Sequence, residues 1–417
     1  MRAWTAQARR GTRVVIPPGR VAQALEASRK ALLLSFAGDD LIGGPWEDTP
    51  PDPFCLGELI AALGTYGFSA EAGEALRGLL DRQLPSGGFD PRDEGAAATG
   101  ASVAAITGEW RRQRDPDLIA TGWAAVALAA RLIVRRSPPT RRGIDALTDL
   151  AWSWRGLTDA ADVLRAGGDE DGAAAASSGA AEQRAAIDVA LEDAGVIAAL
   201  HAIEPDGPIP ARDRRVGELL ATFRATPGPA VLNSWDHTGL SPLATLRLAR
   251  LEAVRGEPQA MERIRWAATA ASGTFSWPHA IHPTHGGGTA GDGHDLRTSA
   301  LFLLAVRSLL VHDPIDDRTG PALVLCPVLP AEWEGQELEV HDAPTSVGQL
   351  SFAVRWHGVH PALLWELRPH DGIGPVTIRA PGLDPTWSTT APKGEQLLGA
   401  VAAETVSGPR PAGPGRP

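Results

Sequence analysis

Apolar residues recur every three or four positions along most of the chain before residue 314. The first such stretch, 21–37, gathers its Val, Ala and Leu residues on one side of a helix. Residues 173–178 are small and lack this pattern, so a loop is an open alternative there. The pattern predicts about twelve helices, and eleven ranges show it: 21–37, 54–66, 70–84, 97–112, 115–135, 144–164, 181–201, 211–225, 241–255, 258–271 and 296–311.

The segments between these helices alternate in length. Short turns alternate with longer loops that collect Trp, Asp, Glu and His residues. A series of antiparallel helix pairs that closes on itself forms a toroid, with all loops from outer to inner helices at one end. An open solenoid is the alternative, but solenoids repeat with a fixed sequence period, and none is found here. We therefore expect a toroid of helix pairs with a site at one end.

The periodicity changes near Pro314. Segments 351–356, 363–368 and 375–379 alternate between apolar and polar residues, as half-buried β-strands do. No folded element is predicted before Arg20, and this abrupt start raises the hypothesis that an upstream part of an ancestral protein is missing. We expect an N-terminal arm at 1–19, a toroid at 20–313, a small antiparallel β-domain at 314–404 and a disordered tail at 405–417.

The segment 276–295 is the most unusual of the chain. It holds one Trp, four His, two Asp and five Gly residues. Glycine and proline disfavour helix interiors, so the segment is predicted to be a long loop, and long loops within compact domains are usually functional or disordered. We interpret this central loop as ordered and placed over a pocket. The alternative is a Gly-rich connector whose His residues only form turns.

Composition and charge narrow the possible partners. The chain has 417 residues, of which 43% are hydrophobic, and a net charge of −11. Phosphate binding needs a basic surface, so we do not expect nucleic acid as a partner. The longest apolar run, 118–130, is too short to cross a bilayer, and no signal peptide is recognised. We expect a cytoplasmic protein with no membrane partner and no cofactor, and leave its oligomeric state open.

The central loop resembles a segment of the six-hairpin glycosidases, the glucoamylase-like clan. The resemblance is carried by the string Trp277-Pro278-His279-Ala280-Ile281-His282-Pro283, followed by Gly286-Gly287-Gly288 and Gly291-Asp292-Gly293-His294. It extends more weakly over most of residues 20–370. The resemblance implies a mainly α fold, an (α/α)6 six-hairpin toroid followed by a small antiparallel β-sandwich-like domain, with a carbohydrate as partner.

The resemblance also implies hydrolysis of an α-linked glucoside or oligosaccharide with inversion. That reaction needs one carboxylic acid to protonate the leaving oxygen and one carboxylate to activate water. The chain departs from the family at these positions. His279 stands where the family has its catalytic base. The stretch 151–156 matches the family's segment that carries the catalytic acid, and it has the tryptophans but no carboxylate. The stretch 54–57 lacks the Arg–Asp pair that the family has near its second inner helix.

Three other carboxylates are candidates for catalysis. Asp236 lies between two aromatic residues, although it could simply cap the next helix. Asp292 lies between two glycines, whereas its neighbour Asp295 precedes a helix and is interpreted as an N-cap. Glu109 lies within a helix beside Trp110, where a solvated position is the simpler interpretation.

Aromatic residues and histidines are the candidates for substrate binding. Tryptophans can stack on sugar rings, but they are equally common in protein cores. The loop histidines are not interpreted as a metal site, because flexible Gly-rich spacing does not fix a coordination geometry. The predicted binding residues are Trp277, His279, His282, Trp235, Trp154 and Trp46.

Three functions remain open from the sequence. The first is a glycoside hydrolase that uses Asp236, Asp292 or Glu109. The second is a catalytically degenerate relative that binds carbohydrate or another protein. The third is a terpene cyclase-like enzyme, because 83–89 resembles the Gln…Gly-Gly-Phe turns of that group. That turn occurs once, without an Asp-rich or zinc motif, so we consider the third function the weakest.

Overall fold

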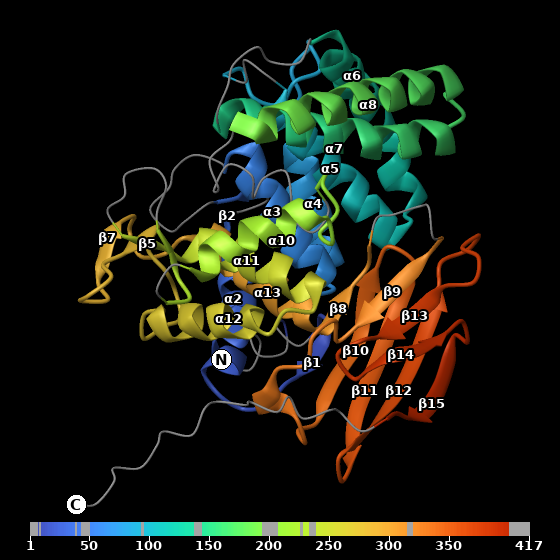
Figure 1. The fold of residues 1–417 in the computed structure, drawn as a ribbon. Helices are drawn as coiled ribbons and strands as arrows, with labels where there is room; N and C mark the ends of the chain where they lie inside the picture. The colour runs from blue at the N-terminus through green and yellow to red at the C-terminus, as the bar shows by residue number, and fades with distance from the viewer. Residues whose placement is uncertain are drawn as a thin grey trace, which may run out of the picture.

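The structure is a computed structural model that describes residues 7, 10–37, 40–42, 51–92, 96–136, 144–193, 207–225, 228–232, 239–314 and 320–399. These residues contain eleven α-helices (Figure 1). All but α8 begin and end within a few residues of the predicted ranges, whereas α8 begins at Glu170 and not at 181. The bounds are α2 Arg20–Leu34, α3 Pro53–Thr65, α4 Ser69–Leu80, α5 Ala97–Gln113, α6 Pro116–Arg135, α7 Ile144–Ala166, α8 Glu170–Asp193, α10 Arg214–Arg224, α11 Pro242–Arg255, α12 Gln259–Ala270 and α13 Leu296–Leu310.

Local sequence explains where several helices begin. Asp52, Asp115, Asp213, Ser241 and Asp295 each accept a hydrogen bond from a backbone N–H of the first helical turn. Such capping satisfies donors that have no partner within the helix. Proline follows three of these caps, at the start of α3, α6 and α11, where its missing N–H costs nothing. The interpretation of Asp295 as an N-cap is confirmed.

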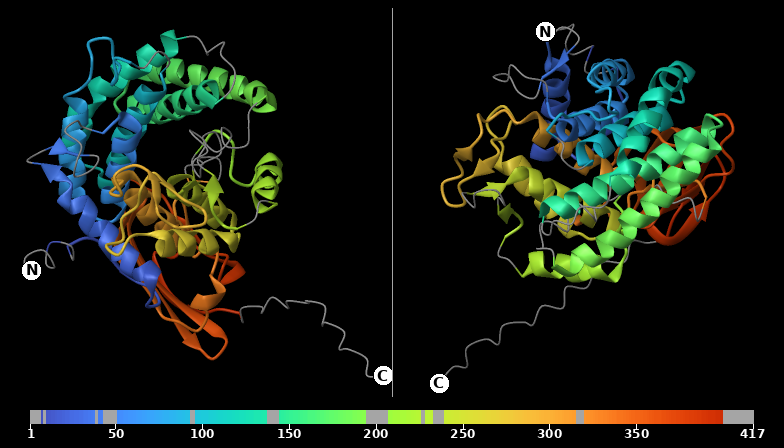
Figure 2. Two further views of the ribbon diagram at one scale, coloured as in Figure 1. Left: turned by 90° about the vertical axis from the view of Figure 1, so that its left-hand side faces the viewer. Right: turned by 90° about the horizontal axis from the view of Figure 1, so that it is seen from above.

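The helices curve around a common axis as two layers (Figure 2). Helices α3, α5, α7, α11 and α13 form the inner layer, and each packs against a neighbouring outer helix: α4, α6, α8, α12 or α2. The first helix, α2, packs against α12 and α13 and so joins the two ends of the series. On the other side, a second hydrophobic cluster links α7, α8, α10 and α11. The predicted toroid of helix pairs is confirmed.

Residues 173–178, for which a loop was an open alternative, lie within α8. Ala173, Ala176 and Ala180 are buried, and α8 packs closely along α7. Gly179 lies so close to α7 that an added Cβ atom would be 3.0 Å from a methyl group of Leu157. The residues are small because the two helices approach each other closely, which the sequence pattern alone does not reveal.

The C-terminal part forms two packed sheets (Figure 1). One sheet has the order β1-β10-β11-β12-β15 and the other β14-β13-β9-β8. All pairings are antiparallel except that of β13 with β9. The predicted β-sandwich-like domain is confirmed, and its strands are β8 Val311–His312, β9 Ala322–Leu325, β10 Leu338–Thr345, β11 Gly348–His357, β12 His360–Pro369, β13 Thr377–Ala380, β14 Asp384–Thr389 and β15 Lys393–Leu397.

The expectation that no folded element precedes Arg20 is wrong. Residues Arg13–Val15 form strand β1, which pairs with β10 and places Val14 opposite Val340. A strand of three residues is too short to show a period, and its partner lies more than 300 residues away in the sequence. The N-terminal segment therefore belongs to the larger sheet of the sandwich. The other predicted domain boundaries stay predictions.

The central loop is ordered, as expected, and contains a small hairpin. Strands β6 (Ala280–Ile281) and β7 (Gly288–Ala290) extend a sheet begun by β4 (Val231–Leu232) and β5 (Leu240–Ser241). This sheet lies on the side of the toroid away from the sandwich (Figure 1). Among the described helices, none is both long and apolar enough to cross a membrane.

Candidate functional site

A cavity of about 210 Å³ lies among the inner helices of the toroid. We call it the central cavity. Its walls come from α3, α5, α7, α11 and α13, from Gly207 and Pro208, and from the β8 end and the β10–β11 turn of the sandwich. The volume is below the usual range of about 300–1,000 Å³ for drug-sized ligands. It therefore suits a small ligand better than an extended one.

Small residues at helical spacing create this space. Helix α3 contributes Gly57 and Ala61, and α5 contributes Ala101, Ala105 and Gly108. Residues three or four positions apart lie on the same side of a helix, so these short side chains share one side of α3 and of α5. The two helices pack closely there, since a Cβ atom added at Gly57 would lie 3.7 Å from the Ala105 Cβ. The sequence showed helices here, but only their packing shows which face is the inner one.

Two aromatic side chains form one wall of the cavity. Phe54 and Trp152 meet edge to face, with 5.7 Å between their ring centroids. Trp152 is held in place by a close contact of α5 with α7: a Cβ atom added at Gly100 would lie 2.1 Å from the Trp152 carbonyl oxygen. The two rings give an otherwise polar lining an apolar surface.

Glu58 is a buried carboxylate in the lining of the central cavity. Arg247 and Arg297 both donate hydrogen bonds to it. Burial alone would raise the pKa of Glu58, but the two guanidinium groups outweigh it and lower the pKa from 4.5 to about 2. Glu58 is therefore ionised at neutral pH and cannot serve as the acid that protonates a leaving group.

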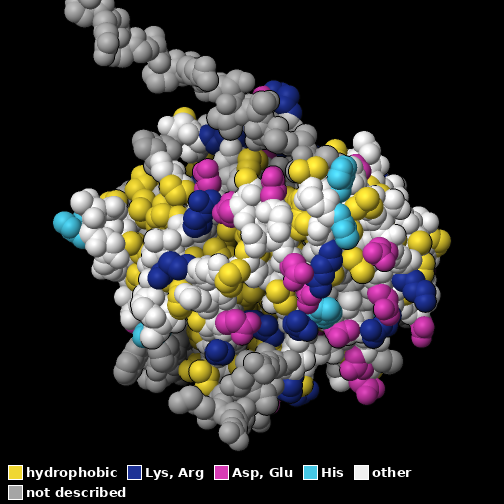
Figure 3. Space-filling view, turned by 90° about the horizontal axis from the view of Figure 1, so that it is seen from below, with side chains coloured by type: hydrophobic (Ala, Val, Ile, Leu, Met, Phe, Trp, Pro, Cys, Tyr) yellow, Lys and Arg dark blue, Asp and Glu magenta, His cyan; other side chains and the backbone are white. Residues whose placement is uncertain are grey.

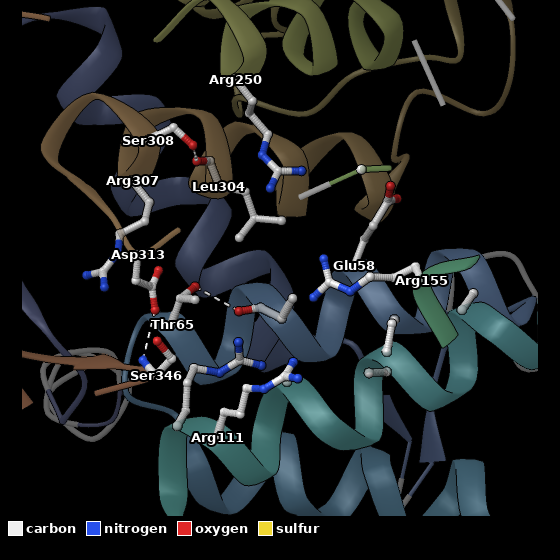
Figure 4. A pocket seen from close by; sticks show the side chains of 18 of the residues that line it. Glu58, Thr65, Arg111, Arg155, Arg250, Leu304, Arg307, Ser308, Asp313 and Ser346 are labelled. Carbon is white, nitrogen blue, oxygen red and sulfur yellow. Dashed lines mark hydrogen bonds between the residues drawn. The ribbon is translucent and has the colours of Figure 1, made fainter. Parts of the chain in front are cut away.

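Asp313 is the other carboxylate of the described lining. It accepts a hydrogen bond of 2.8 Å from the backbone N–H of Ser346, in the turn between β10 and β11. Figure 4 shows Asp313 and Glu58 on different sides of the cavity. The contact with Ser346 fixes Asp313 where the toroid meets the sandwich.

Five arginines complete the lining: Arg111, Arg112, Arg155, Arg250 and Arg307. They are not among the residues that the sequence analysis singled out. Arginine is frequent in the helices of this chain, so a single arginine does not indicate a functional site. Only the convergence of three or more helices brings these side chains to one place (Figure 4).

Glu109, a predicted catalytic residue, is fully buried and does not line the central cavity. Arg112 donates two hydrogen bonds to one of its carboxylate oxygens, at 3.0 and 2.7 Å, and Gln113 donates one to the other, at 2.5 Å. Gly64 leaves the space that this carboxylate occupies, since a Cβ atom there would lie 2.0 Å from it. These contacts support a structural role for Glu109.

Two of the predicted binding tryptophans pack within the protein. Trp277 is 0% exposed, stacks on Phe302 at 5.3 Å and donates a hydrogen bond of 2.8 Å to the Ala267 carbonyl. Trp154 packs against both hydrophobic clusters, and its neighbour Trp152, two positions earlier on α7, faces the cavity instead. These contacts favour the core interpretation for Trp277.

The central loop does not contribute to the lining of the central cavity. His279 and Asp292 are exposed. The Asp292 side chain accepts a hydrogen bond from the His294 backbone, and the His282 ring accepts bonds from the backbone of Thr284 and His285. These side chains stabilise the turns of the hairpin, so the expected placement of the loop over a pocket is not seen for this cavity.

The remaining predicted site residues, Asp236, Trp235 and Trp46, lie outside the described residues. Their roles stay predictions. Within the described ranges, no group of three or more His, Cys, Asp and Glu side chains is arranged to hold a metal ion.

Several solved structures have a similar fold. An α-L-rhamnosidase from Streptomyces avermitilis, complexed with L-rhamnose, matches 89% of this chain with 38% of its own, at a TM-score of 0.63 and 13% identity. A bacterial glucoamylase complexed with acarbose matches 73% of this chain with 57% of its own, at 0.56 and 14%. A wild-type glycosidase matches 71% of this chain with 99% of its own, at 0.54 and 16%.

The fold is that of the six-hairpin glycosidases. The resemblance proposed from the central loop is thus confirmed at the level of the fold. No protein-family model matches the sequence, and no curated protein matches it. At identities this low the similarity establishes architecture, and the chemistry has to be argued from the residues of this chain.

Proposed function

We propose that this protein binds a carbohydrate in the central cavity without hydrolysing it by the two-carboxylate route. One observation carries the proposal: the cavity lies among the inner helices and has an aromatic wall, yet both carboxylates of its described lining are held by other groups of the protein, Glu58 by two arginines and Asp313 by the backbone N–H of Ser346. Glu58 is held ionised between two arginines. Inverting hydrolysis needs a protonated and an ionised carboxyl group on opposite faces of the sugar.

Hydrolysis of an α-linked glucoside or oligosaccharide is the second candidate. It is supported by the likeness in fold to the glucoamylase and the other glycosidases. In this case the acid and base would come from Asp236 and Asp292. Asp292 is exposed on the hairpin, so this function would need a site near the hairpin.

The two functions can be separated with a panel of aryl-α- and β-glycosides and α-linked disaccharides. We expect no sugar release, and we expect some of these sugars to raise the melting temperature, because a ligand of the native state stabilises it. Sugar release by the wild type that is lost in Asp236→Ala or Asp292→Ala would overturn the proposal and establish the hydrolase.

The site itself is tested with Trp152→Ala. Loss of one stacking wall should weaken binding of a sugar that stabilises the wild type by about tenfold. The control is Trp266→Ala, since Trp266 is also half-buried but lies on the outer helix α12 and does not line the cavity. Equal effects of both variants on affinity would place the sugar elsewhere.

A further inference from the structure

The charge of the central cavity is opposite to that of the chain. The chain carries a net charge of −11, whereas the cavity lining has five arginines and two carboxylates. With their ion-pair partners included, seven arginines and five carboxylates of the described residues surround the cavity. Elsewhere, for example on the face seen from below in Figure 3, acidic and basic side chains are interspersed.

Most of these arginines have an acidic partner. Arg111 bonds Asp159 at 2.6 Å and Asp162 at 2.5 Å, and Arg155 bonds Asp159 at 2.6 Å. Arg112 is paired with Glu109, as described above. The charges of these three arginines are balanced by acidic side chains of the protein, so this part of the arginine cluster has a structural role.

Two arginines of the lining, Arg250 and Arg307, form no ion pair with a carboxylate among the described residues. Among the described residues, no hydrogen bond or ion pair is formed by the Arg250 guanidinium, and its Nε atom is buried without a partner. Arg307 donates to the Pro344 carbonyl at 2.9 Å, a neutral acceptor. Burial lowers the pKa of Arg307, and the charge of Asp313 opposes this only in part. Arg250 is half-buried, and the charges of Glu58 and Asp313 act on Arg250 and Arg307 without forming an ion pair with them. A cation withdrawn from water without a paired carboxylate is costly, so both positions favour an anion.

The geometry suits an anion that enters with a ligand. Arg250 reaches into the cavity from α11, and Arg155 and Arg111 point into the same space from α7 and α5 (Figure 4). The guanidinium group is a planar fork of donors that matches carboxylate and phosphate oxygens. The aromatic wall of Phe54 and Trp152 borders the same space and offers a surface for a ring.

We propose that the ligand of the central cavity is a sugar bearing a carboxylate or phosphate group, which Arg250 binds directly. This inference rests on the proposed carbohydrate-binding function and adds the charge of the ligand. It also names Arg250 as the residue that selects a charged sugar over a neutral one.

The test is isothermal titration calorimetry of the whole chain at low ionic strength. The probes are methyl α-glucoside, glucuronate, glucose 6-phosphate and inorganic phosphate. The variants are Arg250→Gln, which removes the charge, and Arg250→Lys, which keeps the charge without the fork. The control is Arg265→Gln, because Arg265 is exposed on α12 and pairs with Glu332 far from the cavity lining.

We expect glucuronate or glucose 6-phosphate to bind the wild type at least about tenfold more tightly than methyl α-glucoside. Arg250→Gln should weaken the charged sugar by about 10- to 100-fold, the usual effect of losing a charge-assisted hydrogen bond, and leave the neutral sugar nearly unchanged. Arg250→Lys should bind with intermediate affinity, and Arg265→Gln like the wild type. The two charged sugars show which anionic group is preferred.

Other outcomes separate the two proposals. Equal affinity for neutral and charged sugars, unaffected in Arg250→Gln, would overturn the charge inference and leave carbohydrate binding intact. Binding of inorganic phosphate as tightly as of glucose 6-phosphate, with no binding of glucuronate or the neutral sugar, would overturn the carbohydrate function. Absence of binding by every probe would overturn both.

Discussion

At the scale of the residue, two buried carboxylates show how ion pairs decide what an acidic side chain can do. Glu58 lies between Arg247 and Arg297, and Glu109 is bonded by Arg112 and Gln113. Both sit on inner helices of a glycosidase-like toroid, where an acid would be expected to work. In each case hydrogen bonds from arginine, and from Gln113 at Glu109, occupy both carboxylate oxygens, so these carboxylates stabilise the fold.

The role of Glu109 is tested by Glu109→Ala. We expect the variant to lose about 3–5 kcal/mol of unfolding free energy, because it removes the buried member of the ion pair and leaves Arg112, whose side chain is 13% exposed, without its counter-charge. Urea denaturation measures this loss. Glu262→Ala is the control, since Glu262 is exposed on α12 and should change stability by less than about 0.5 kcal/mol. Unchanged stability in Glu109→Ala would contradict the structural role.

Glu58 makes the stability depend on pH. Its folded-state pKa of about 2 lies below its ordinary value of 4.5. The stabilisation by Glu58 is therefore fully present above about pH 4.5 and is lost as the pH falls towards about 2. The shift in pKa corresponds to about 3 kcal/mol of unfolding free energy.

Unfolding free energies measured between pH 6 and pH 2 check this expectation. The wild-type curve should fall more steeply with decreasing pH than that of Glu58→Gln, which cannot take up the proton. Curves of equal slope would mean that Glu58 is not held ionised by its two arginines.

At the scale of the element, close helix contacts determine the shape of the cavity. Helices α5 and α7 touch through Gly100 and Gly156, where an added Cβ atom would lie 2.1 Å from the Trp152 carbonyl oxygen and 2.6 Å from the Gly100 Cα, respectively. This contact turns Trp152 and Arg155 towards the cavity. The glycines are required because only backbone fits between the two helices.

Gly100→Ala tests this contact. Its methyl group would meet backbone, which cannot rotate away, so we expect a loss of about 1–3 kcal/mol in unfolding free energy. Gly73→Ala on α4 is the matched control, because no atom lies within 4 Å of an added Cβ there. The control should gain about 0.5–1 kcal/mol from the better helix propensity of alanine. Equal effects of both substitutions in urea denaturation would exclude the close contact.

At the scale of the whole molecule, toroid and sandwich share one hydrophobic core. The main cluster of buried residues includes Leu309 of α13, Leu323 of β9 and Leu338 of β10. Asp313 adds a polar contact to the β10–β11 turn, and β1 ties the N-terminal segment to the larger sheet. The two parts therefore support each other, and the cavity takes residues from both.

A shared core predicts that the two parts unfold together. Calorimetry of the wild type should give a single transition. Leu338→Ala, a truncation of a residue that is 0% exposed, should lower the unfolding free energy by about 2–5 kcal/mol. Hydrogen exchange should show the loss of protection in α3 and α13 as well as in the sheets. Two separate transitions, with the toroid unaffected by Leu338→Ala, would contradict the shared core.

The sequence by itself determined the secondary structure and the class of fold. Period and capping residues located the described helices other than α8 to within a few residues, since both depend on neighbours in the chain. The change of period near Pro314 located the sandwich, and the central loop indicated the six-hairpin fold. Residues 13–15 and 173–178 were misjudged or left open because their structure depends on partners distant in the sequence.

Only the tertiary structure decided which residues share the central cavity. The sequence pointed to Trp277, His279, His282 and Asp292, and these side chains lie in the core or in the hairpin. The cavity is instead lined by arginines and small residues from five helices, none of which has a recognisable motif. Periodicity shows that a helix has an apolar face, but the charge that gathers where several helices meet is a property of their packing.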